Sequence, residues 1–154
     1  MLKNFFYFLQ KTSFLKVLNG QFADQLSAET TFHVSNQTPL RKVFITQQVT
    51  DHLFPGLTAK QALVYASKFK NATEKVKIDH EATALKLLSE MAMPEAANRR
   101  VEHLSGGQQR RLILACELTS LKMPNLILAD EAVSGLDTDS AEKVRHLSDF
   151  FTIV

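Results

Sequence analysis

Two short segments carry residues whose types and spacing could do chemistry, and the first is Leu-Ser-Gly-Gly-Gln-Gln-Arg-Arg at 104–111. Ser105, Gly106 and Gly107 would open a helix there. Unpaired N–H groups, the positive end of the helix dipole and a hydroxyl would then converge on one point, which suits an anion. Glycine also lets the backbone approach a phosphate with no Cβ in the way. The segment therefore predicts a phosphate site, with an ordinary capped helix as the alternative.

The second segment is an apolar run at 126–129 followed by Asp130 and Glu131. A buried strand with two carboxylates at its C-terminal end could hold Mg²⁺ with Asp130, directly or through water. Glu131 could then orient or deprotonate an attacking water. A strand that simply ends in a polar loop is the alternative. Ser-Gly-Leu-Asp at 134–137 follows, and alone it would suit a plain surface turn.

The elements that would position these segments alternate between helix and strand. Capping-box pairs, Thr58 with Gln61 and Ser105 with Gln108, would open two of the helices. This order predicts an α/β chain with an inserted helical region. The predicted elements are a helix at 12–19 that Gly20 ends, strands at 29–34 and 41–46, helices at about 58–70, 79–93 and 105–120, a buried parallel strand at 126–129 and a helix at 138–150.

Apolar spacing also predicts which helix faces point inward. Both sets below follow the three-to-four-residue spacing of an amphipathic helix. They are Ala82, Leu85, Leu88 and Met91 or Met93 in the helix that Pro94 would end, and Ala141, Val144 and Leu147 in the last helix.

Composition limits the function classes. The chain has 154 residues, enough for one ordinary domain or part of a larger one, and a net charge of +2, so composition gives no argument for nucleic acid. A single cysteine, Cys116, excludes an internal disulfide, and no apolar stretch reaches the ~18 residues of a transmembrane helix. Only five residues are glycine, and none precedes Gly20.

Taken together, these segments resemble the nucleotide-binding domain of ABC transporters, a P-loop nucleoside triphosphatase with a helical subdomain. Residues 104–108 match the family signature, 130–131 match the Walker B aspartate and catalytic glutamate, and 134–137 match the D-loop. The resemblance covers roughly residues 11–147. Further pieces are similar to the white-like G subfamily of half-transporters, namely Leu57-Thr58, Glu117-Leu118 and 135–141.

The resemblance implies ATP and Mg²⁺ as cofactors, held in a head-to-tail sandwich of two such domains. Glu131 would be the catalytic residue for in-line attack of water on the γ-phosphate. The implied Mg²⁺ ligands are Thr12, Gln47 and Asp130. The implied nucleotide-binding residues are Lys11, Thr12, Ser13, Gln47 and Asp137, with Ser105, Gly106, Gly107 and Gln108 contributed from across the sandwich.

A glutamine is expected at the end of the strand that precedes the helical region. Phe-Ile-Thr-Gln-Gln at 44–48 fits, and the resemblance favours Gln47 over Gln48 as the Mg²⁺ ligand that senses the transport domain. Both could instead be polar residues of a strand-end turn.

The phosphate loop departs from the family pattern. Lys11, Thr12 and Ser13 match the lysine and hydroxyls of Walker A, but Phe5 and Gln10 stand where the pattern has glycine. Aromatic bulk at 5–8 would crowd the phosphate path, and side chains resist a positive φ. We therefore expect weak or absent ATP hydrolysis; a plain helix start at 11–13 is the alternative.

The whole chain, 1–154, is interpreted as a partial nucleotide-binding domain, incomplete at both ends. Residues 1–10 are unmatched, and about 57–103 would form the helical subdomain. The implied partners are a second nucleotide-binding domain, as a homo- or heterodimer, and a transmembrane domain absent from this chain, with no nucleic acid. The implied location is the cytoplasmic face of a membrane.

Three functions are compatible with this sequence. The chain could be part of an ATP-hydrolysing transporter subunit with an impaired phosphate loop. It could be a non-hydrolysing module that lends its signature to another subunit. It could also be a soluble ABC ATPase, although only 58 residues separate Gln47 from Ser105, too few for the long coiled coil of repair-type members.

Overall fold

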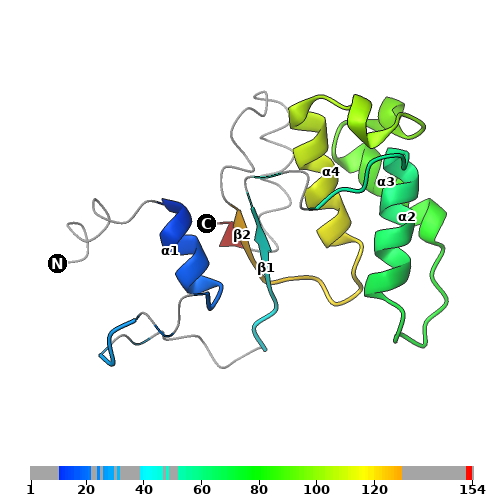
Figure 1. Cartoon of the computed structure of the whole chain (residues 1–154). Helices are drawn as coiled ribbons and strands as arrows, with labels where there is room; N and C mark the ends of the chain where they lie inside the picture. Colours follow the sequence, from blue (N-terminus) through cyan, green and yellow to red (C-terminus); the bar gives the residue numbers. More distant parts are fainter. Residues whose placement is uncertain are drawn as a thin grey trace.

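The computed structural model describes residues 11–21, 24, 26–29, 31, 39–46, 48, 52–129 and 152–153. Within this part of the chain, a parallel sheet lies beside a block of helices, and α1 (Lys11–Leu18) lies on the other side of the sheet in the view of Figure 1. The predicted α/β fold with an inserted helical region is confirmed.

The described sheet has three parallel strands in the order β1-β2-β3. The predicted strands at 41–46 and 126–129 are confirmed as β1 (Lys42–Ile45) and β2 (Leu126–Ala129), and β3 (Thr152–Ile153) was not predicted. Lys42 is the register partner of Leu126, and Ile45 that of Ala129. Because β1 and β2 are parallel, their C-terminal ends lie at the same edge of the sheet.

A glycine ends α1, as predicted. Gly20 has a φ of +88°, and its N–H donates to the carbonyl of Val17 over 2.9 Å. The N–H of Gln21 donates to the carbonyl of Lys16 over 2.9 Å, so the helix end is a Schellman motif. The Lys42 Nζ lies 2.7 Å from the carbonyl oxygen of Asn19, which ties this end to β1.

The helical block contains α2 (Ala59–Lys70), α3 (His80–Glu90) and α4 (Gly106–Leu118), with short 3₁₀ helices η4 (Pro94–Ala96) and η5 (Val101–His103) between α3 and α4. The predicted capping box of α2 is confirmed: Thr58 Oγ1 accepts from the Gln61 N–H, and Gln61 Oε1 accepts from the Thr58 N–H. The largest fully buried apolar side chains of this block share one core with Ile127 of β2; they are Leu63, Leu88, Met91, Met93, Leu112 and Ile113. Leu128, the next residue of β2, is also fully buried but lies outside that core.

The predicted inner face of α3 is partly wrong. Leu88, Met91 and Met93 are buried, but Leu85 is half exposed and Ala82 is exposed. The residues that pack inward follow the spacing i, i+3, i+4, i+7, namely Ala84, Leu87, Leu88 and Met91. The helix has two overlapping apolar faces. The face with Ala84 and Leu87 is the one that packs against α2 and α4.

The end of α3 also differs from the prediction. Ala92, with a φ of +53°, stops the helix before Pro94 is reached. The N–H of Met93 donates to the carbonyl of Leu88 over 2.9 Å, which completes a second Schellman motif with alanine in the glycine position.

Two predicted elements fall wholly or mostly outside the described residues. In the predicted strand at 29–34, only Glu29 and Thr31 are described, and neither is in a strand. The predicted helix at 138–150, with Ala141, Val144 and Leu147, lies outside the described residues.

Candidate functional site

The candidate site is built at the N-terminus of α4. Ser105 is the N-cap, and its hydroxyl accepts the N–H of Gln108 over 3.2 Å. In return, Gln108 Oε1 accepts the N–H of Ser105 over 3.1 Å. This reciprocal pair confirms the predicted capping box and holds the first turn of α4 in a defined shape.

Gly106 is exposed on that first turn and is not required by the fold itself. A Cβ added at Gly106 would have no heavy atom within 4 Å, and the residue has ordinary helical backbone. Glycine in a helix is less stable than alanine by roughly 0.5–1 kcal/mol. The local structure therefore gives no packing reason for glycine here, whereas a ligand or partner in close approach would give one.

The first N–H groups of an α-helix have no partner within the helix itself. Among the described residues, no acceptor is found for the N–H groups of Gly106 and Gly107. Both lie at the positive end of a helix of 13 residues, beside the exposed Ser105. Two N–H donors, one hydroxyl and the helix dipole can together bind a phosphate oxygen.

Buried residues on both sides hold the site in place. Leu104 and Leu112 are buried before and after it. Gln109 Nε2 donates to the carbonyl of Val101 over 3.0 Å, which fixes η5 against α4. Gln108 Nε2 lies 3.4 Å from Glu95 Oε1, so its side chain reaches both its own helix cap and η4.

Thr46, directly after β1, contacts His52, a histidine that residue spacing does not single out. The N–H of Thr46 donates to His52 Nε2 over 3.1 Å, and the Thr46 hydroxyl lies 3.0 Å from the same nitrogen. Gln48 is exposed, and Gln47 lies outside the described residues. Nothing in residue spacing indicates this contact, because a lone histidine in a loop has no pattern.

The remaining predicted site residues are described in part or not at all. Lys11 and Thr12 lie in the first turn of α1, and Ser13 is half-buried there. The structure thus groups Ser105, Gly106, Gly107 and Gln108. The other predicted site residues, Gln47, Asp130, Glu131 and Asp137, lie outside the described residues, and so do Phe5 and Gln10 of the phosphate loop.

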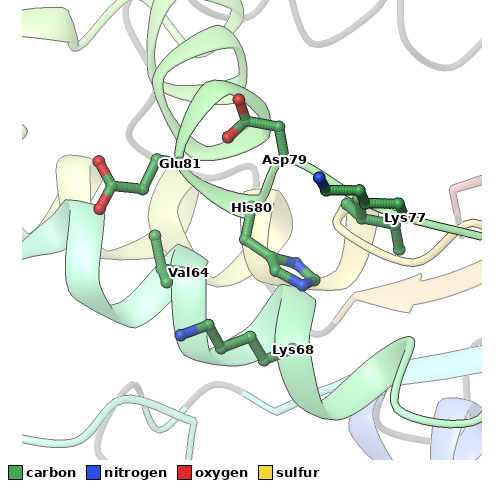
Figure 2. A pocket seen from close by; sticks show the side chains of 7 residues that line it. Val64, Lys68, Lys77, Asp79, His80 and Glu81 are labelled. Carbon is green, nitrogen blue, oxygen red and sulfur yellow. The ribbon is translucent and has the colours of Figure 1, made fainter.

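A separate pocket of about 480 Å³ lies between α2 and the start of α3, and none of the predicted site residues lines it (Figure 2). The ring Nδ1 of His80 is 2.8 Å from the Ser67 hydroxyl, but Ser67 is fully buried and cannot act as a nucleophile on a ligand. Within the described ranges, no group of three or more metal-ligating side chains could hold a metal ion. The lining residues are Val64, Lys68, Lys77, Ile78, Asp79, His80 and Glu81.

Comparison with known sequences identifies the family. Residues 11–134 match the sequence model of the family described as "ABC transporter", and the chain therefore belongs to the ABC transporter family. This match begins at Lys11, so residues 1–10 lie outside it.

The chain is similar to several members of the G subfamily. It is 30% identical over 145 residues to ABC transporter G family member 26 of Arabidopsis thaliana, covering 89% of this chain and 21% of that protein. It is 32% identical over 149 residues to G family member 7 of the same plant, covering 87% and 19%. The predicted resemblance to the G subfamily is confirmed, and the chain spans about a fifth of these relatives.

Solved structures give the same fold. The ATP-binding cassette MJ0796, described as dimeric, in a post-hydrolysis state and bound to ADP and Pi, superposes with a TM-score of 0.59 at 30% identity. The alignment covers 75% of this chain and 51% of that cassette. The predicted P-loop ATPase fold of the ABC type is confirmed.

Proposed function

We propose that this chain is the ATP-binding part of an ABC transporter, and that the N-terminus of α4 binds the γ-phosphate of an ATP held mainly by a second cassette. The observation that carries this proposal is Gly106, which is exposed, has open space around its missing Cβ and offers an N–H with no acceptor among the described residues. A phosphate oxygen can approach such a backbone closely.

ATP and Mg²⁺ are the proposed cofactors. The donor set at α4 fits a phosphate oxygen, because it consists of N–H groups and a hydroxyl with no carboxylate in the first turn. Mg²⁺ would neutralise developing charge on the phosphates. Its proposed ligands are Thr12, Gln47 and Asp130, while Glu131 would orient the attacking water.

The proposed nucleotide-binding residues fall into two groups, one from each cassette. Ser105 and Gln108 would act with Gly106 and Gly107 from one cassette. Lys11, Thr12, Ser13, Gln47 and Asp137 would act within the other.

The proposed partners are a second nucleotide-binding cassette and a membrane domain. The dimeric state of MJ0796 supports the first. The G family relatives, which are about five times longer than the aligned part of this chain, support the second. Residues 57–103 are proposed as the helical subdomain, and the cytoplasmic face of a membrane as the location. In the described part of the chain, no helix has the length and apolarity to cross a membrane.

A second candidate is a module that does not hydrolyse ATP and lends its signature to a competent cassette. Phe5 and Gln10, which replace the glycines of the phosphate loop, favour this alternative. The two candidates share the α4 site and differ only in whether this chain also turns over its own ATP.

The glycine amides of the full chain offer a direct test of the α4 site. The sequence has five glycines, so its ¹H–¹⁵N spectrum holds five glycine signals, and loss of one in Gly106→Ala assigns that residue. With Mg²⁺-ATP and MJ0796 as the second cassette, we expect the Gly106 and Gly107 signals to move. The Gly20 N–H already donates to Val17 and cannot donate to a phosphate, so its signal should move less.

The variant Gly106→Ala also separates an effect on stability from an effect on ATP binding. Gly106→Ala should leave stability unchanged or raise it by up to about 1 kcal/mol, because the Cβ meets open space. The same variant should weaken the ATP response. The proposal would be overturned if the two cassettes associate but the Gly106 and Gly107 signals do not move when Mg²⁺-ATP is added.

A further inference from the structure

The segment that enters α2 and the segment that leads to α4 are joined along their length. The N–H of Val101 donates to the carbonyl of Leu57 over 2.9 Å, and the N–H of Ala59 donates to the carbonyl of Arg99 over 3.0 Å. Thr58 and Arg100 form an antiparallel bridge between these two bonds. Residues 57–59 and 99–101 therefore form a short ladder outside the sheet.

One side chain extends this ladder by a further step. Glu102 Oε2 accepts the N–H of Gly56 over 2.9 Å. Gly56 follows Pro55 and has a φ of +86°, so it occupies the position of a tight turn that favours glycine. The bond thus joins an exposed turn directly to Glu102 of η5, which precedes Ser105 by three residues.

The charge on Glu102 strengthens this contact. The N–H of Gly56 is the main cause that lowers the pKa of Glu102 below its usual 4.5, followed by the N–H of Glu102 itself. His103 and Arg100 contribute smaller effects in the same direction, and Arg100 Nη1 lies 3.8 Å from the other carboxylate oxygen. A hydrogen bond to an ionised carboxylate is stronger than one between neutral groups.

Buried residues fix both joined segments to the core. Leu53 and Ala59 are buried on either side of the turn, and Val101 and Leu104 are buried on either side of Glu102. Residues 54–56, between Leu53 and Ala59, are exposed. Among the described side chains, only that of Glu102 accepts a hydrogen bond from an N–H group of this turn.

We propose that Glu102 is a positioning residue that ties the Pro55–Gly56 turn to the signature segment, so that a displacement of the turn reaches Ser105 and Gly106. The turn belongs to the stretch between β1 and α2, which also carries the proposed Mg²⁺ ligand Gln47. Glu102 thus connects two segments. One carries a proposed ligand of the chain's own nucleotide, and the other is proposed to bind the nucleotide of the partner cassette. The nucleotide part of this inference rests on the proposed function; the mechanical link does not.

A pH titration of the full wild-type chain tests the link without nucleotide. We expect the Gly56 amide signal to follow ionisation of Glu102, with a midpoint below 4.5. The Gly106 signal should move with the same midpoint. In Glu102→Gln that common step should vanish from both signals. A Gly106 signal that keeps its titration in Glu102→Gln would overturn the proposal.

A second set of variants tests the effect on nucleotide. Glu102→Ala should reduce the apparent ATP affinity reported by Gly106 several-fold in the presence of MJ0796, and Glu102→Gln should restore part of it because an amide oxygen can still accept the Gly56 N–H. Glu81→Ala is the matched control, since Glu81 pairs with Lys60 on the α3 side and touches neither segment at the turn. An ATP response in Glu102→Ala equal to that of wild type would also overturn the proposal.

The two proposals fail in different ways. If Mg²⁺-ATP does not move the Gly106 signal of the wild type while the two cassettes associate, the proposed function is wrong, and the pH titration still decides the role of Glu102. If ATP moves Gly106 but the common titration step is absent, the proposed function stands and the positioning role of Glu102 is wrong.

Discussion

The side-chain amide of Asn71, at the end of α2, donates a hydrogen bond to the backbone carbonyl of Thr119, at the end of α4, over 2.9 Å. Asn71 Oδ1 accepts the N–H of Leu121 over 2.8 Å, and Asn71 Nδ2 lies 2.8 Å from the carbonyl oxygen of Ser67. With Asn71 only 5% exposed, this one side chain joins the C-terminal ends of two helices. The C-terminal end of α4 is therefore held by a polar contact inside the helical block.

We expect Asn71→Ala to lower the free energy of unfolding by about 2 kcal/mol, because a carbonyl and an N–H lose their partners where little water reaches them. Asn71→Asp should be at least as destabilising at neutral pH, since a carboxylate would face two carbonyl oxygens. Asn98→Ala, at an exposed position, is the control and should change stability by less than about 0.5 kcal/mol. Urea denaturation measures all three, and equal stability of Asn71→Ala and wild type would contradict this account.

Ser105 has a structural role and a proposed binding role, and two substitutions separate them. Ser105→Ala removes the acceptor of the Gln108 N–H and should lower stability by about 1 kcal/mol. Ser105→Asp keeps an N-cap acceptor and should preserve stability, but it places a negative charge where a phosphate is proposed to bind. Thermal unfolding and the Gly106 response to Mg²⁺-ATP are the two measurements. An undiminished ATP response in Ser105→Asp would argue against a phosphate at this point.

We expect the thiol of Cys116 to lower the stability of the folded protein as the pH rises into the alkaline range. Burial raises the pKa of its thiol from 9.0 to about 12, and the nearby Glu117 acts in the same direction. In the unfolded chain the thiol ionises near its ordinary pKa, so between about 9 and 12 the unfolded state binds fewer protons than the folded state. The stabilising effect of the neutral thiol is present below this window and is lost as the pH rises through it.

The measurement is urea denaturation at a series of alkaline pH values, for the wild type and Cys116→Ala. The wild type should lose stability more steeply with pH, by at most about 1.4 kcal/mol per pH unit from this one group. The two proteins differ only at residue 116, so the difference between the two curves reports the thiol. Parallel curves would show that the thiol ionises as readily in the folded protein as in the unfolded one.

The phosphate loop gives a prediction that depends on sequence alone, because Phe5 and Gln10 lie outside the described residues. The isolated chain should release little or no phosphate from Mg²⁺-ATP. Replacing Phe5 and Gln10 with glycine should raise ATP affinity, since the backbone N–H groups could then surround the phosphates. Phosphate release and calorimetric titration measure the two effects. Rapid Mg²⁺-dependent turnover that Glu131→Gln abolishes would show that the native loop is competent.

Local patterns predicted local structure well. The capping boxes at Thr58 and Ser105 involve residues three apart, and the Gly20 stop depends on one residue's conformational freedom, so each can be recognised in a short stretch of sequence. The apolar run of β2 predicted a buried parallel strand for the same reason. The start of α4 at Ser105 was predicted on these grounds, and the role of Ser105 to Gln108 in binding nucleotide stays a prediction from the family resemblance.

Contacts between distant segments could not be predicted in this way. Glu102 and Gly56 are 46 residues apart, and Asn71 and Thr119 are 48 apart, with ordinary polar residue types at each position. The inner face of α3 was misassigned because Leu85 and Leu87 both lie on apolar faces, and only the neighbouring helices decide which one is buried. Two residues, as in β3, are too few for a strand pattern.

The pairing of β1 with β2 has a consequence for the order of folding. Arg41 and Asn125, just before these strands, are hydrogen-bonded over 2.8 Å although 84 residues separate them. Closing so long a loop in a disordered chain is entropically unfavourable, whereas the helical hairpin of α2 and α3 closes a far shorter one. We expect the helical block to form first and to bring the strand ends together. The sheet amides should then exchange with solvent deuterium mainly through global unfolding, and the exposed turn at Gly56 through much smaller openings.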